Sequence, residues 1–221
     1  MNKPYKIAVI DYRMSNMFSI KNALTVLGFD VEVTADYSTI VSCDGAILPG
    51  VGSFPEAMKN IKELNLDYAI KDIISSGKPF VGICLGFQLL FDKSGEFEDT
   101  FGLGIISGEV NNLSKLNEEI RVPHVGWNNI KRKSSFDIKG ASGALENINY
   151  QDYFYFVHSY YVKPSNDIDI FTTTEYSGIE FCSSIMKDNI FACQFHPEKS
   201  GVKGLALLKD FFLQRCRSHN G

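Results

Sequence analysis

Short apolar runs alternate with helical patterns through the first half of the chain, and this alternation is the strongest constraint on the fold. Each apolar run ends in a Gly, Asp or Pro, which is typical of a buried strand that stops at a turn. Strands that alternate with helices form parallel sheets. The predicted strands are 6–11, 31–33, 44–48 and 80–83, and the predicted helices are 19–27, 55–61 and 66–74.

From Gly102 onward the strand-like segments lie closer together and are separated by turn residues. This spacing indicates a β-rich second half, and residues 202–216 carry apolar side chains at helical spacing. We expect an α/β fold with a mostly parallel, doubly wound sheet flanked by helices, in a single domain over residues 1–221. The additional predicted strands are 103–106, 153–157, 169–173, 181–186 and 190–195.

The composition excludes several classes of protein. The 22 Lys and Arg against 26 Asp and Glu give a net charge of −4, which does not favour binding to nucleic acid or a membrane surface. The short basic run at 131–133 is better interpreted as a solvated turn than as a nucleic-acid patch. The apolar stretch 80–91 is interrupted by polar and glycine residues and is too short to span a membrane. The five cysteines are scattered and form no C-x-x-C pair, so neither disulfides nor a metal site is expected. Without a signal-peptide pattern, we expect a cytoplasmic protein.

A cysteine lies between glycines where the strand 80–83 gives way to a helical pattern. Gly82-Ile83-Cys84-Leu85-Gly86 is the thiol form of a nucleophile elbow. Such a turn holds its central residue in strained backbone geometry, and the small flanking residues let the strand and the helix approach closely. Cys84 is therefore a candidate nucleophile. The alternative is an inert, buried cysteine in a glycine-rich turn.

A thiol nucleophile needs a base, and the chain has four histidines. His196 ends the apolar run 190–195, and in an extended chain Glu198 projects to the same side. A carboxylate in that place can orient an imidazole. The alternative is a structural His at a strand end. His158 is expected to be a core residue and His124 a packing or surface residue, and His219 lies in a polar tail.

Two motifs resemble those of the class I (triad) glutamine amidotransferases. Residues 82–88 are similar to the family's G-I-C-L-G-x-Q, and residues 194–198 are similar to its Q-F-H-P-E. Within that class, further segments resemble the glutaminase subunits of imidazole glycerol phosphate synthases. These segments are Asp11-Tyr12 with Asn16, and residues 48–54, 123–128, 155–161 and 196–201.

The resemblance implies a role for each matching position. Cys84 would attack the side-chain amide of glutamine, His196 would move protons, and Glu198 would orient His196. Glutamate and ammonia would be released through a cysteine thioester. The backbone of Gly50, Val51 and Gly52 would stabilise the oxyanion. The positions that match glutamine-binding residues are Gln88, Glu96, Ser159 and Tyr160.

The resemblance also implies a partner, because ammonia freed into neutral water mostly becomes ammonium and the chain has no room for an acceptor domain. In the family this partner is a (β/α)₈-barrel cyclase subunit, and the complex forms imidazole glycerol phosphate and AICAR in histidine biosynthesis. No cofactor is implied. The positions that match the family's partner interface are Asn16, Trp127, Tyr155 and Lys199.

One segment departs from the family pattern. The family pattern after the first strand is D-Y-G-x-G-N, whereas in this sequence Arg13 and Ser15 replace both glycines. A paralogous subunit that supplies ammonia for amidation of a surface-polysaccharide or flagellar sugar is therefore an alternative. Two further alternatives are a cysteine hydrolase on the same fold, which would have no use for an amino-acid clamp, and an inactive binding module.

Overall fold

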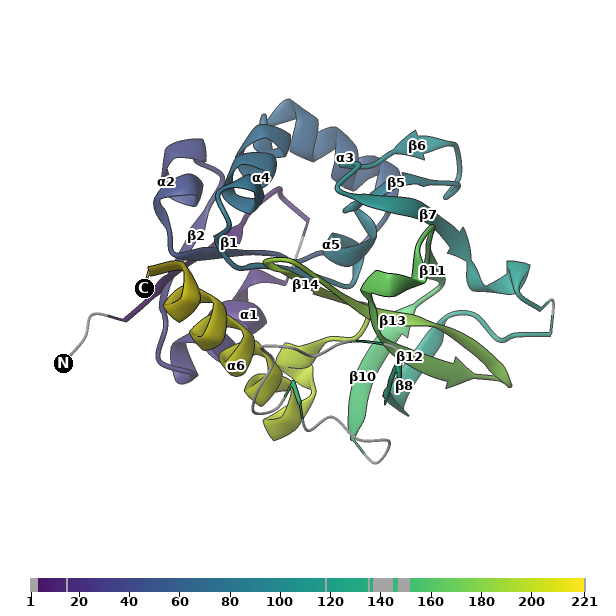
Figure 1. Cartoon of the computed structure of the whole chain (residues 1–221). Helices are drawn as coiled ribbons and strands as arrows, with labels where there is room; N and C mark the ends of the chain where they lie inside the picture. The colour runs from purple at the N-terminus through teal and green to yellow at the C-terminus, as the bar shows by residue number, and fades with distance from the viewer. Residues whose placement is uncertain are drawn as a thin grey trace.

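A twelve-stranded mixed sheet forms the centre of the molecule (Figure 1). The computed structural model describes residues 4–14, 16–117, 119–134, 136, 145–146 and 152–220. Ser15, one of the two departures from the family pattern, lies outside the described residues. Along the main path of the sheet the strands follow the order β2-β1-β3-β4-β14-β13-β11-β7-β5-β6, with β12 and β9 added beside β13.

The first half of the chain builds the parallel part of this sheet, as the alternation of strands and helices predicted. Each of these strands pairs in parallel with its neighbour, and β14, from the end of the chain, completes this part beside β4. The strands are β1 (Lys6–Ile10), β2 (Asp30–Thr34), β3 (Gly45–Leu48), β4 (Phe80–Ile83) and β14 (Ile190–Cys193).

The second half is rich in β-structure, as expected, and its pairings in the sheet are antiparallel apart from β5 with β7. Two further strands, β8 (His124–Asn129) and β10 (Tyr153–His158), form a separate antiparallel pair. The remaining strands are β5 (Phe91–Ser94), β6 (Thr100–Phe101), β7 (Ile106–Asn112), β9 (Lys131–Arg132), β11 (Tyr160–Pro164), β12 (Ile170–Tyr176) and β13 (Ile179–Lys187).

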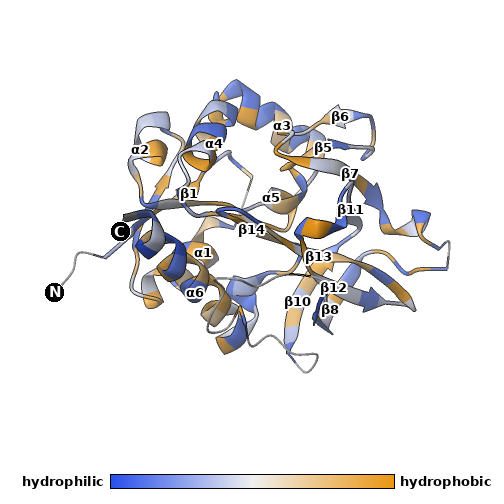
Figure 2. Cartoon of the chain, viewed as in Figure 1, coloured by the Kyte–Doolittle hydropathy of each residue, from blue (hydrophilic) through white to orange (hydrophobic). Residues whose placement is uncertain are grey.

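Helices cover both faces of the parallel strands. On one face α2, α3 and α4 bury their apolar side chains against Ala8 and Ile10, and on the other α1 and α6 pack against Ile7 and Val9. Figure 2 shows that the hydropathy agrees with this packing. Apolar residues follow β1 and β14, and α6 carries both apolar and polar residues. The helices are α1 (Met17–Val26), α2 (Tyr37–Ser42), α3 (Phe54–Glu63), α4 (Leu66–Ser75), α5 (Leu85–Gln88) and α6 (Gly201–Asn220), with short 3₁₀ turns η1 (Leu113–Lys115), η2 (Asp167–Asp169) and η3 (Pro197–Lys199).

The segment after Cys84 differs from the prediction. The apolar spacing there suggested a longer helix, but α5 ends at Gln88 and β5 begins at Phe91. Leu89 and Leu90 use their backbone carbonyls to accept hydrogen bonds from residues 103, 105 and 106 instead of extending the helix. The predicted strand 103–106 is also wrong except at its last residue, because these bonds form an irregular connection before β7.

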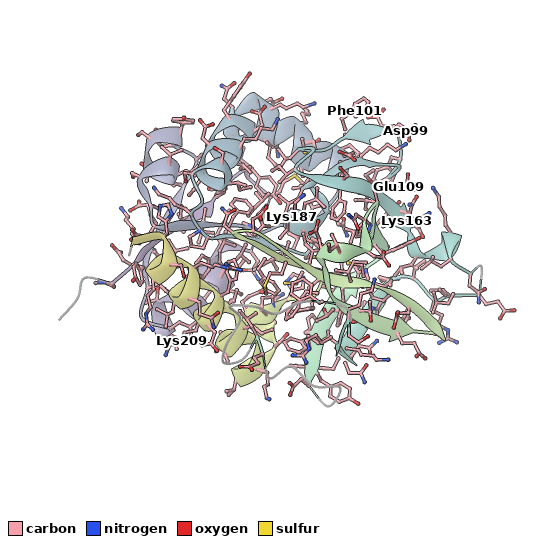
Figure 3. All side chains as sticks on the ribbon, in the orientation of Figure 1. Asp99, Phe101, Glu109, Lys163, Lys187 and Lys209 are labelled. Carbon is pink, nitrogen blue, oxygen red and sulfur yellow. The ribbon has the colours of Figure 1, made fainter. Side chains whose placement is uncertain are left out.

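Polar and exposed side chains lie around the rim of the structure. Figure 3 shows Glu109 on β7 and Lys163 on β11 next to each other, which agrees with their register across the two strands. Phe101 is the last residue of β6, pairs with Lys93 of β5, and is exposed. Among the described helices, none is both long enough and apolar enough to cross a membrane.

The glycines around Cys84 allow the close approach of strand and helix that the elbow requires. A Cβ atom at Gly86 would overlap the backbone carbonyl of Leu48, and one at Gly82 would lie 3.1 Å from the carbonyl oxygen of Gly86. We predict that Gly86→Ala lowers the free energy of unfolding by at least ~3 kcal/mol, because the backbone cannot move aside cheaply. Chemical denaturation measures this change.

Gly95→Ala is the matched control. A Cβ atom at Gly95 would have its nearest neighbour at 3.8 Å, an ordinary contact distance. This variant should change the free energy of unfolding by less than ~1 kcal/mol. Equal stability of the two variants would contradict the close packing at Gly86.

Candidate active site

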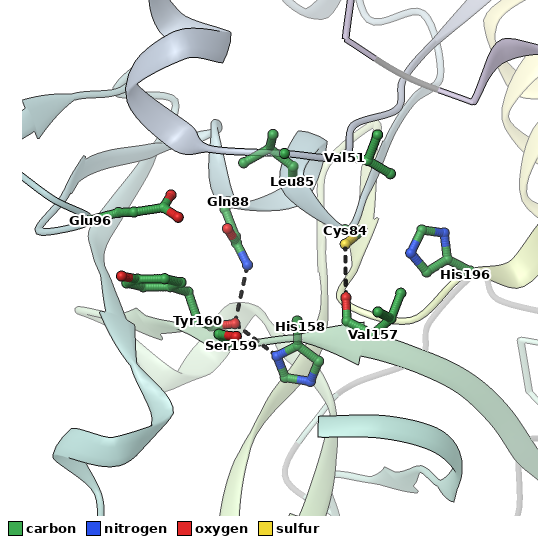
Figure 4. A pocket seen from close by; sticks show the side chains of 11 residues that line it. Val51, Cys84, Leu85, Gln88, Glu96, Val157, His158, Ser159, Tyr160 and His196 are labelled. Atoms are coloured by element: carbon green, nitrogen blue, oxygen red, sulfur yellow. Dashed lines mark hydrogen bonds between the residues drawn. The ribbon is translucent and has the colours of Figure 1, made fainter. Parts of the chain in front are cut away.

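A pocket opens where the chain leaves the end of β4, and Figure 4 shows its walls. Its lining combines a thiol, imidazoles, a carboxamide and a carboxylate, which is a reactive and polar set for so small a space. The lining residues are Val51, Gly52, Cys84, Leu85, Gln88, Glu96, Val157, His158, Ser159, Tyr160 and His196.

Cys84 occupies the strained turn that the sequence predicted. Its backbone angles are φ 55° and ψ −109°, outside the regions that L-residues commonly adopt. The Cys84 amide donates to the carbonyl of Cys193 at 2.8 Å, which joins the turn to the end of β14. The Cys84 side chain is 7% exposed and its Sγ lies 3.9 Å from the carbonyl oxygen of Val157. The elbow therefore presents a sulfur that is sheltered but open to the pocket.

The pairing of β4 with β14 brings the second motif to the same place. His196 follows β14, and its Nδ1 lies 2.9 Å from Oε1 of Glu198, with both side chains at most 4% exposed. This geometry confirms that the two side chains project to the same side. Since the carboxylate accepts the Nδ1 proton, the neutral ring keeps a free lone pair on Nε2. Among the described residues Nε2 has no hydrogen-bond partner, and Figure 4 shows the ring beside Cys84.

The electrostatics of His196 favour the protonated ring. Burial alone would lower the pKa of His196, but the interactions of the ring with the Cys84 sulfur and with the Glu198 carboxylate outweigh it and raise the pKa above its ordinary value. An imidazolium held between a sulfur and a carboxylate stabilises a thiolate. The arrangement can therefore activate a nucleophile and afterwards deliver a proton to a leaving group.

Gln88 and Glu96 lie at the other end of the pocket (Figure 4). Gln88 donates from Nε2 to the carbonyl of Tyr160 at 3.1 Å and to Oε1 of Gln194 at 2.9 Å. Glu96 accepts from the Phe54 amide at 2.7 Å, and its burial raises the pKa of this carboxyl. A carboxylate at one end and a thiol at the other suit a small ligand with an ammonium group at its far end.

The turn predicted to supply oxyanion donors reaches the pocket through Val51 and Gly52. The Val51 amide, however, donates to the carbonyl of Met14 at 3.5 Å and is therefore already engaged in a hydrogen bond. Tyr12 holds the start of the turn, since its hydroxyl donates to the carbonyl of Pro49 at 2.7 Å. Gly52 has a φ of 100°, a conformation that favours glycine.

The backbone conformation at Arg13 is one that favours glycine, the residue in the family pattern at that position. Its φ is 69°, in the left-handed region, and its amide donates to Oδ1 of Asp11 at 2.9 Å. The Asp11–Met14 loop thus keeps a conformation that suits glycine although a larger residue stands there. Met14, one residue further, accepts the Val51 amide. The loop that departs from the family pattern is therefore in direct contact with the candidate oxyanion turn.

His124 and His158 are buried packing residues, as predicted. Nδ1 of His124 lies 3.0 Å from Nε2 of His158, and His158 donates from Nδ1 to the carbonyl of Tyr160 at 2.8 Å. Burial lowers the pKa of His124 to about 4 and that of His158 to about 3. Both rings are therefore neutral near pH 7. Although His158 lines the pocket, it already uses both ring nitrogens.

The four residues predicted at a partner interface lie at or near the surface. Trp127 on β8 and Tyr155 on β10 are register partners with ring centroids 6.1 Å apart, and Trp127 is 56% exposed. Lys199 is exposed in η3, three residues after His196. Asn16 is exposed too, but its side chain caps α1 by accepting from the Ser19 amide. Trp127, Tyr155 and Lys199 thus belong to elements beside the pocket.

Sequence reasoning did not single out two residues that contact the site. Leu85 lines the pocket and directly follows the nucleophile. In related architectures the residue after an elbow nucleophile supplies an oxyanion donor, so the elbow motif is a sequence signal for Leu85. Gln194 is completely buried and donates from Nε2 to Sγ of Cys84 at 3.6 Å. Gln194 belongs to the second motif, but no local sequence pattern predicts its contact with the sulfur. Within the described part of the chain, no group of three or more His, Cys, Asp or Glu could hold a metal ion.

Comparison with known proteins gives consistent matches over almost the whole chain. The family model "Glutamine amidotransferase class-I" matches residues 8–215. "Imidazole glycerol phosphate synthase subunit HisH" of Caldanaerobacter subterraneus subsp. tengcongensis is 47% identical over 93% of this chain and 96% of that protein. The HisH subunit of Aquifex aeolicus is also 47% identical, over 93% of this chain and 95% of that protein.

Solved structures share the fold at much lower sequence identity. PurLQS from Thermotoga maritima has a TM-score of 0.70 at 19% identity, covering 98% of this chain and 99% of that chain. The crystal structure of a glutamine amidotransferase has a TM-score of 0.69 at 15% identity, covering 95% of this chain and 98% of that chain. These similarities confirm the predicted fold class.

The structure predicts that Cys84 is the thiol that reacts in the native protein. All five cysteines are free and buried, but Cys84 alone among them lines the pocket, and burial raises the pKa of the thiols of the other four. We expect iodoacetamide at pH 7.5 to label Cys84 at least tenfold faster than any other cysteine, because alkylation requires an accessible thiolate. Peptide mass spectrometry over a time course measures this selectivity.

The Cys84→Ala variant is the control for this labelling. Native Cys84→Ala protein should incorporate almost no label, and denaturation should restore labelling of its four remaining cysteines. Rapid labelling of another cysteine in the native wild type would refute the prediction.

Proposed function

This chain belongs to the class I glutamine amidotransferase family, among the relatives of the imidazole glycerol phosphate synthase HisH subunits, and on that premise we propose that it hydrolyses glutamine at the pocket around Cys84. One observation carries the proposal. A single pocket holds a thiol beside a carboxylate-oriented imidazole at one end and the Glu96 carboxylate at the other. Glutamine carries its amide and its ammonium group at corresponding ends.

The reaction proceeds through two acyl transfers. The Cys84 thiolate attacks the side-chain amide carbon of glutamine and forms a tetrahedral oxyanion. Its collapse breaks the C–N bond, and protonated His196 gives a proton to the departing nitrogen, so that ammonia leaves and a thioester remains. His196 then takes a proton from water, the hydroxide attacks the thioester, and glutamate leaves as Cys84 is restored. Glu198 keeps Nδ1 of His196 protonated throughout.

The remaining pocket residues orient the substrate. We assign the α-ammonium of glutamine to Glu96. Because both amide hydrogens of Gln88 are used by Tyr160 and Gln194, its carbonyl oxygen is the group left to accept from the substrate. The backbone at Ser159 and Tyr160 forms the wall between the two ends. An amino-acid clamp of this kind favours a glutaminase over a general cysteine hydrolase.

Two backbone amides are the candidate oxyanion donors. The Leu85 amide begins α5 and adjoins the nucleophile, whereas the Val51 amide is bonded to Met14 in this structure. Rotation of the Gly50–Val51 peptide would release Met14 and direct Val51 toward the oxyanion, and the flanking glycines make that rotation sterically cheap. Removing a single oxyanion donor slows a hydrolase by about 10²–10³. We therefore propose that the structure represents a resting state.

The ammonia product requires a partner, and we propose a (β/α)₈-barrel cyclase subunit, as in histidine biosynthesis. The exposed face of β8 and β10 supports an interface, because Val125, Trp127, Tyr153 and Val157 expose apolar side chains next to the pocket. Burial of such a face on association is favourable.

We further propose that the protein is cytoplasmic and acts as one domain. Five free thiols support the first point, and a sheet that both halves of the chain share supports the second.

Substitutions in the triad test the reaction. Cys84→Ala should lower kcat for glutamine hydrolysis by at least ~10⁴, because no nucleophile remains. His196→Ala should cause a loss of similar order, and Glu198→Gln a smaller loss, since Glu198 orients the base but transfers no proton. Ammonia release, coupled to an enzymatic readout in the presence of the partner, measures all three variants.

Cysteine-to-serine variants at Cys43, Cys182 and Cys216 are the controls, and each should keep most of the activity. Circular dichroism verifies the fold of every variant. Turnover by Cys84→Ala at a tenth of the wild-type rate would refute the thioester route. A loss in Glu198→Gln equal to that in His196→Ala would assign Glu198 a different role.

The resting position of Val51 predicts a glutaminase that depends on its partner. We expect the cognate cyclase subunit with its ligand to stimulate glutamine hydrolysis by at least about 10²-fold, the value of one oxyanion donor. Val51→Pro removes the amide hydrogen and should abolish most of this stimulation. Val51→Ala keeps the amide and should retain it. Steady-state rates with and without the partner measure the effect.

The identity of the partner is tested in the same assay. A histidine-pathway cyclase and the barrel protein of a sugar-amidation pathway are compared at one glutamine concentration. Activation by the histidine-pathway cyclase supports the proposal, and activation by the sugar-pathway protein alone assigns the chain to that pathway. Full activity without either protein would contradict the resting state.

A further inference from the structure

We propose that Gln194 is a positioning residue that favours the thiolate of Cys84, an inference that rests on the proposed cysteine chemistry. Gln194 directly follows β14 and is completely buried. Its carboxamide lies between the nucleophile and Gln88, two residues that follow β4. Neither the triad nor the substrate clamp described above includes it.

The hydrogen bonds around Gln194 determine which way its amide points. The Tyr160 carbonyl can only accept, so it requires the amino group of Gln88 to face it, at 3.1 Å. The same Gln88 amino group donates to Oε1 of Gln194 at 2.9 Å. With its oxygen occupied in this way, Gln194 presents its amino group to Cys84, and Nε2 donates to Sγ at 3.6 Å. A backbone carbonyl thus fixes, through two carboxamides, a donor at the sulfur.

A fixed donor distinguishes between the two protonation states of the sulfur. The thiol donates weakly to the Val157 carbonyl at 3.9 Å, and this contact is lost when the proton leaves. The bond from Gln194 remains, and it strengthens because its acceptor becomes charged. Hydrogen bonds to charged groups contribute enough free energy to change a population by roughly tenfold to a hundredfold. Gln194 therefore adds to the effect of His196 on the nucleophile.

Other titratable groups surround the sulfur and stay unchanged in the test. Three of these groups interact electrostatically with Cys84: His196 at the start of η3, Tyr12 in the loop after β1, and Cys193 on β14. Burial raises the pKa of both Tyr12 and Cys193, so these two groups remain neutral near pH 7. Differences between Gln194 variants consequently report on the carboxamide itself.

Two substitutions separate the electrostatic role from a purely structural one. Gln194→Met keeps the length and volume but removes the donor. Gln194→Glu is isosteric and still accepts from Gln88, but it places a carboxylate beside the sulfur. The donation from Gln88 and the positive charge of protonated His196 favour the ionised carboxylate at this buried position, so the shared proton in Gln194→Glu resides on Cys84. Shape alone would make the Glu variant the milder of the two, whereas the electrostatic role makes it the more severe.

Alkylation of Cys84 by iodoacetamide, followed by peptide mass spectrometry at pH 7.5 and pH 9.5, is the experiment. At pH 7.5 we expect Gln194→Met to react about tenfold to a hundredfold more slowly than the wild type, and Gln194→Glu more slowly still. At pH 9.5 the deficit of Gln194→Met should shrink, because a higher pH favours a thiolate whether or not a donor is present. The control is Thr174→Val, which replaces a buried hydroxyl on β12, outside the pocket lining, and should leave the rate unchanged.

The outcomes separate this inference from the proposed function. A Glu variant that reacts faster than the Met variant, or a Met deficit that is equal at both pH values, would overturn the role of Gln194. Thermal unfolding verifies that each variant is folded, and the isosteric Glu variant keeps the test available if Gln194→Met is unstable. Since alkylation needs no glutamine turnover, the expected pattern supports the inference even in a protein that hydrolyses no glutamine.

Discussion

The parallel pairing of β4 with β14 is the interaction on which the site depends. Ile83 lies opposite Cys193, and the Cys84 amide donates to the Cys193 carbonyl, so the register continues into the elbow. More than a hundred residues separate these strands in the sequence. A slip of one residue would turn the side chains that follow β14 to the other face. The positions of Gln194, His196 and Glu198 relative to the sulfur therefore follow from a backbone register.

The same segment connects the site to the exposed β8–β10 strands. The His196 amide donates to the Tyr155 carbonyl at 2.9 Å, and the Tyr155 amide donates to Oγ of Ser200 at 3.0 Å. The strand that carries the proposed interface is thus hydrogen-bonded on both sides of Glu198. A protein bound against Trp127 and Tyr155 would press on the backbone that holds the imidazole. Two hydrogen bonds thus connect the exposed β8–β10 strands directly to the segment that carries His196 and Glu198.

Burial explains why these polar groups are held so specifically. The side chains of His196 and Glu198 are almost completely excluded from solvent, and Gln194 is fully buried. In such surroundings an unpaired polar group is costly, so each donor has a strong preference for its acceptor. His196 Nε2 and Glu198 Oε2 nevertheless lack partners in the described part of the chain. The atom that faces the reacting sulfur is thus the one that the fold leaves available.

The sequence by itself determined the local features of this protein. Alternating strands and helices predicted the parallel half of the sheet, the glycines around Cys84 predicted the elbow, and the period of an extended chain placed Glu198 beside His196. These features depend on residues close in sequence, where steric limits and side-chain period act directly.

Tertiary structure alone decided the long-range features. The early end of α5 depends on hydrogen bonds from residues 103–106, and the resting position of Val51 depends on a carbonyl in a different loop. The contact of Gln194 with the sulfur requires two strands that are distant in the sequence to meet in one register. Backbone carbonyls accept from any amide within reach, so no residue type marks such partners in a sequence, and only the folded arrangement of the strands selects them.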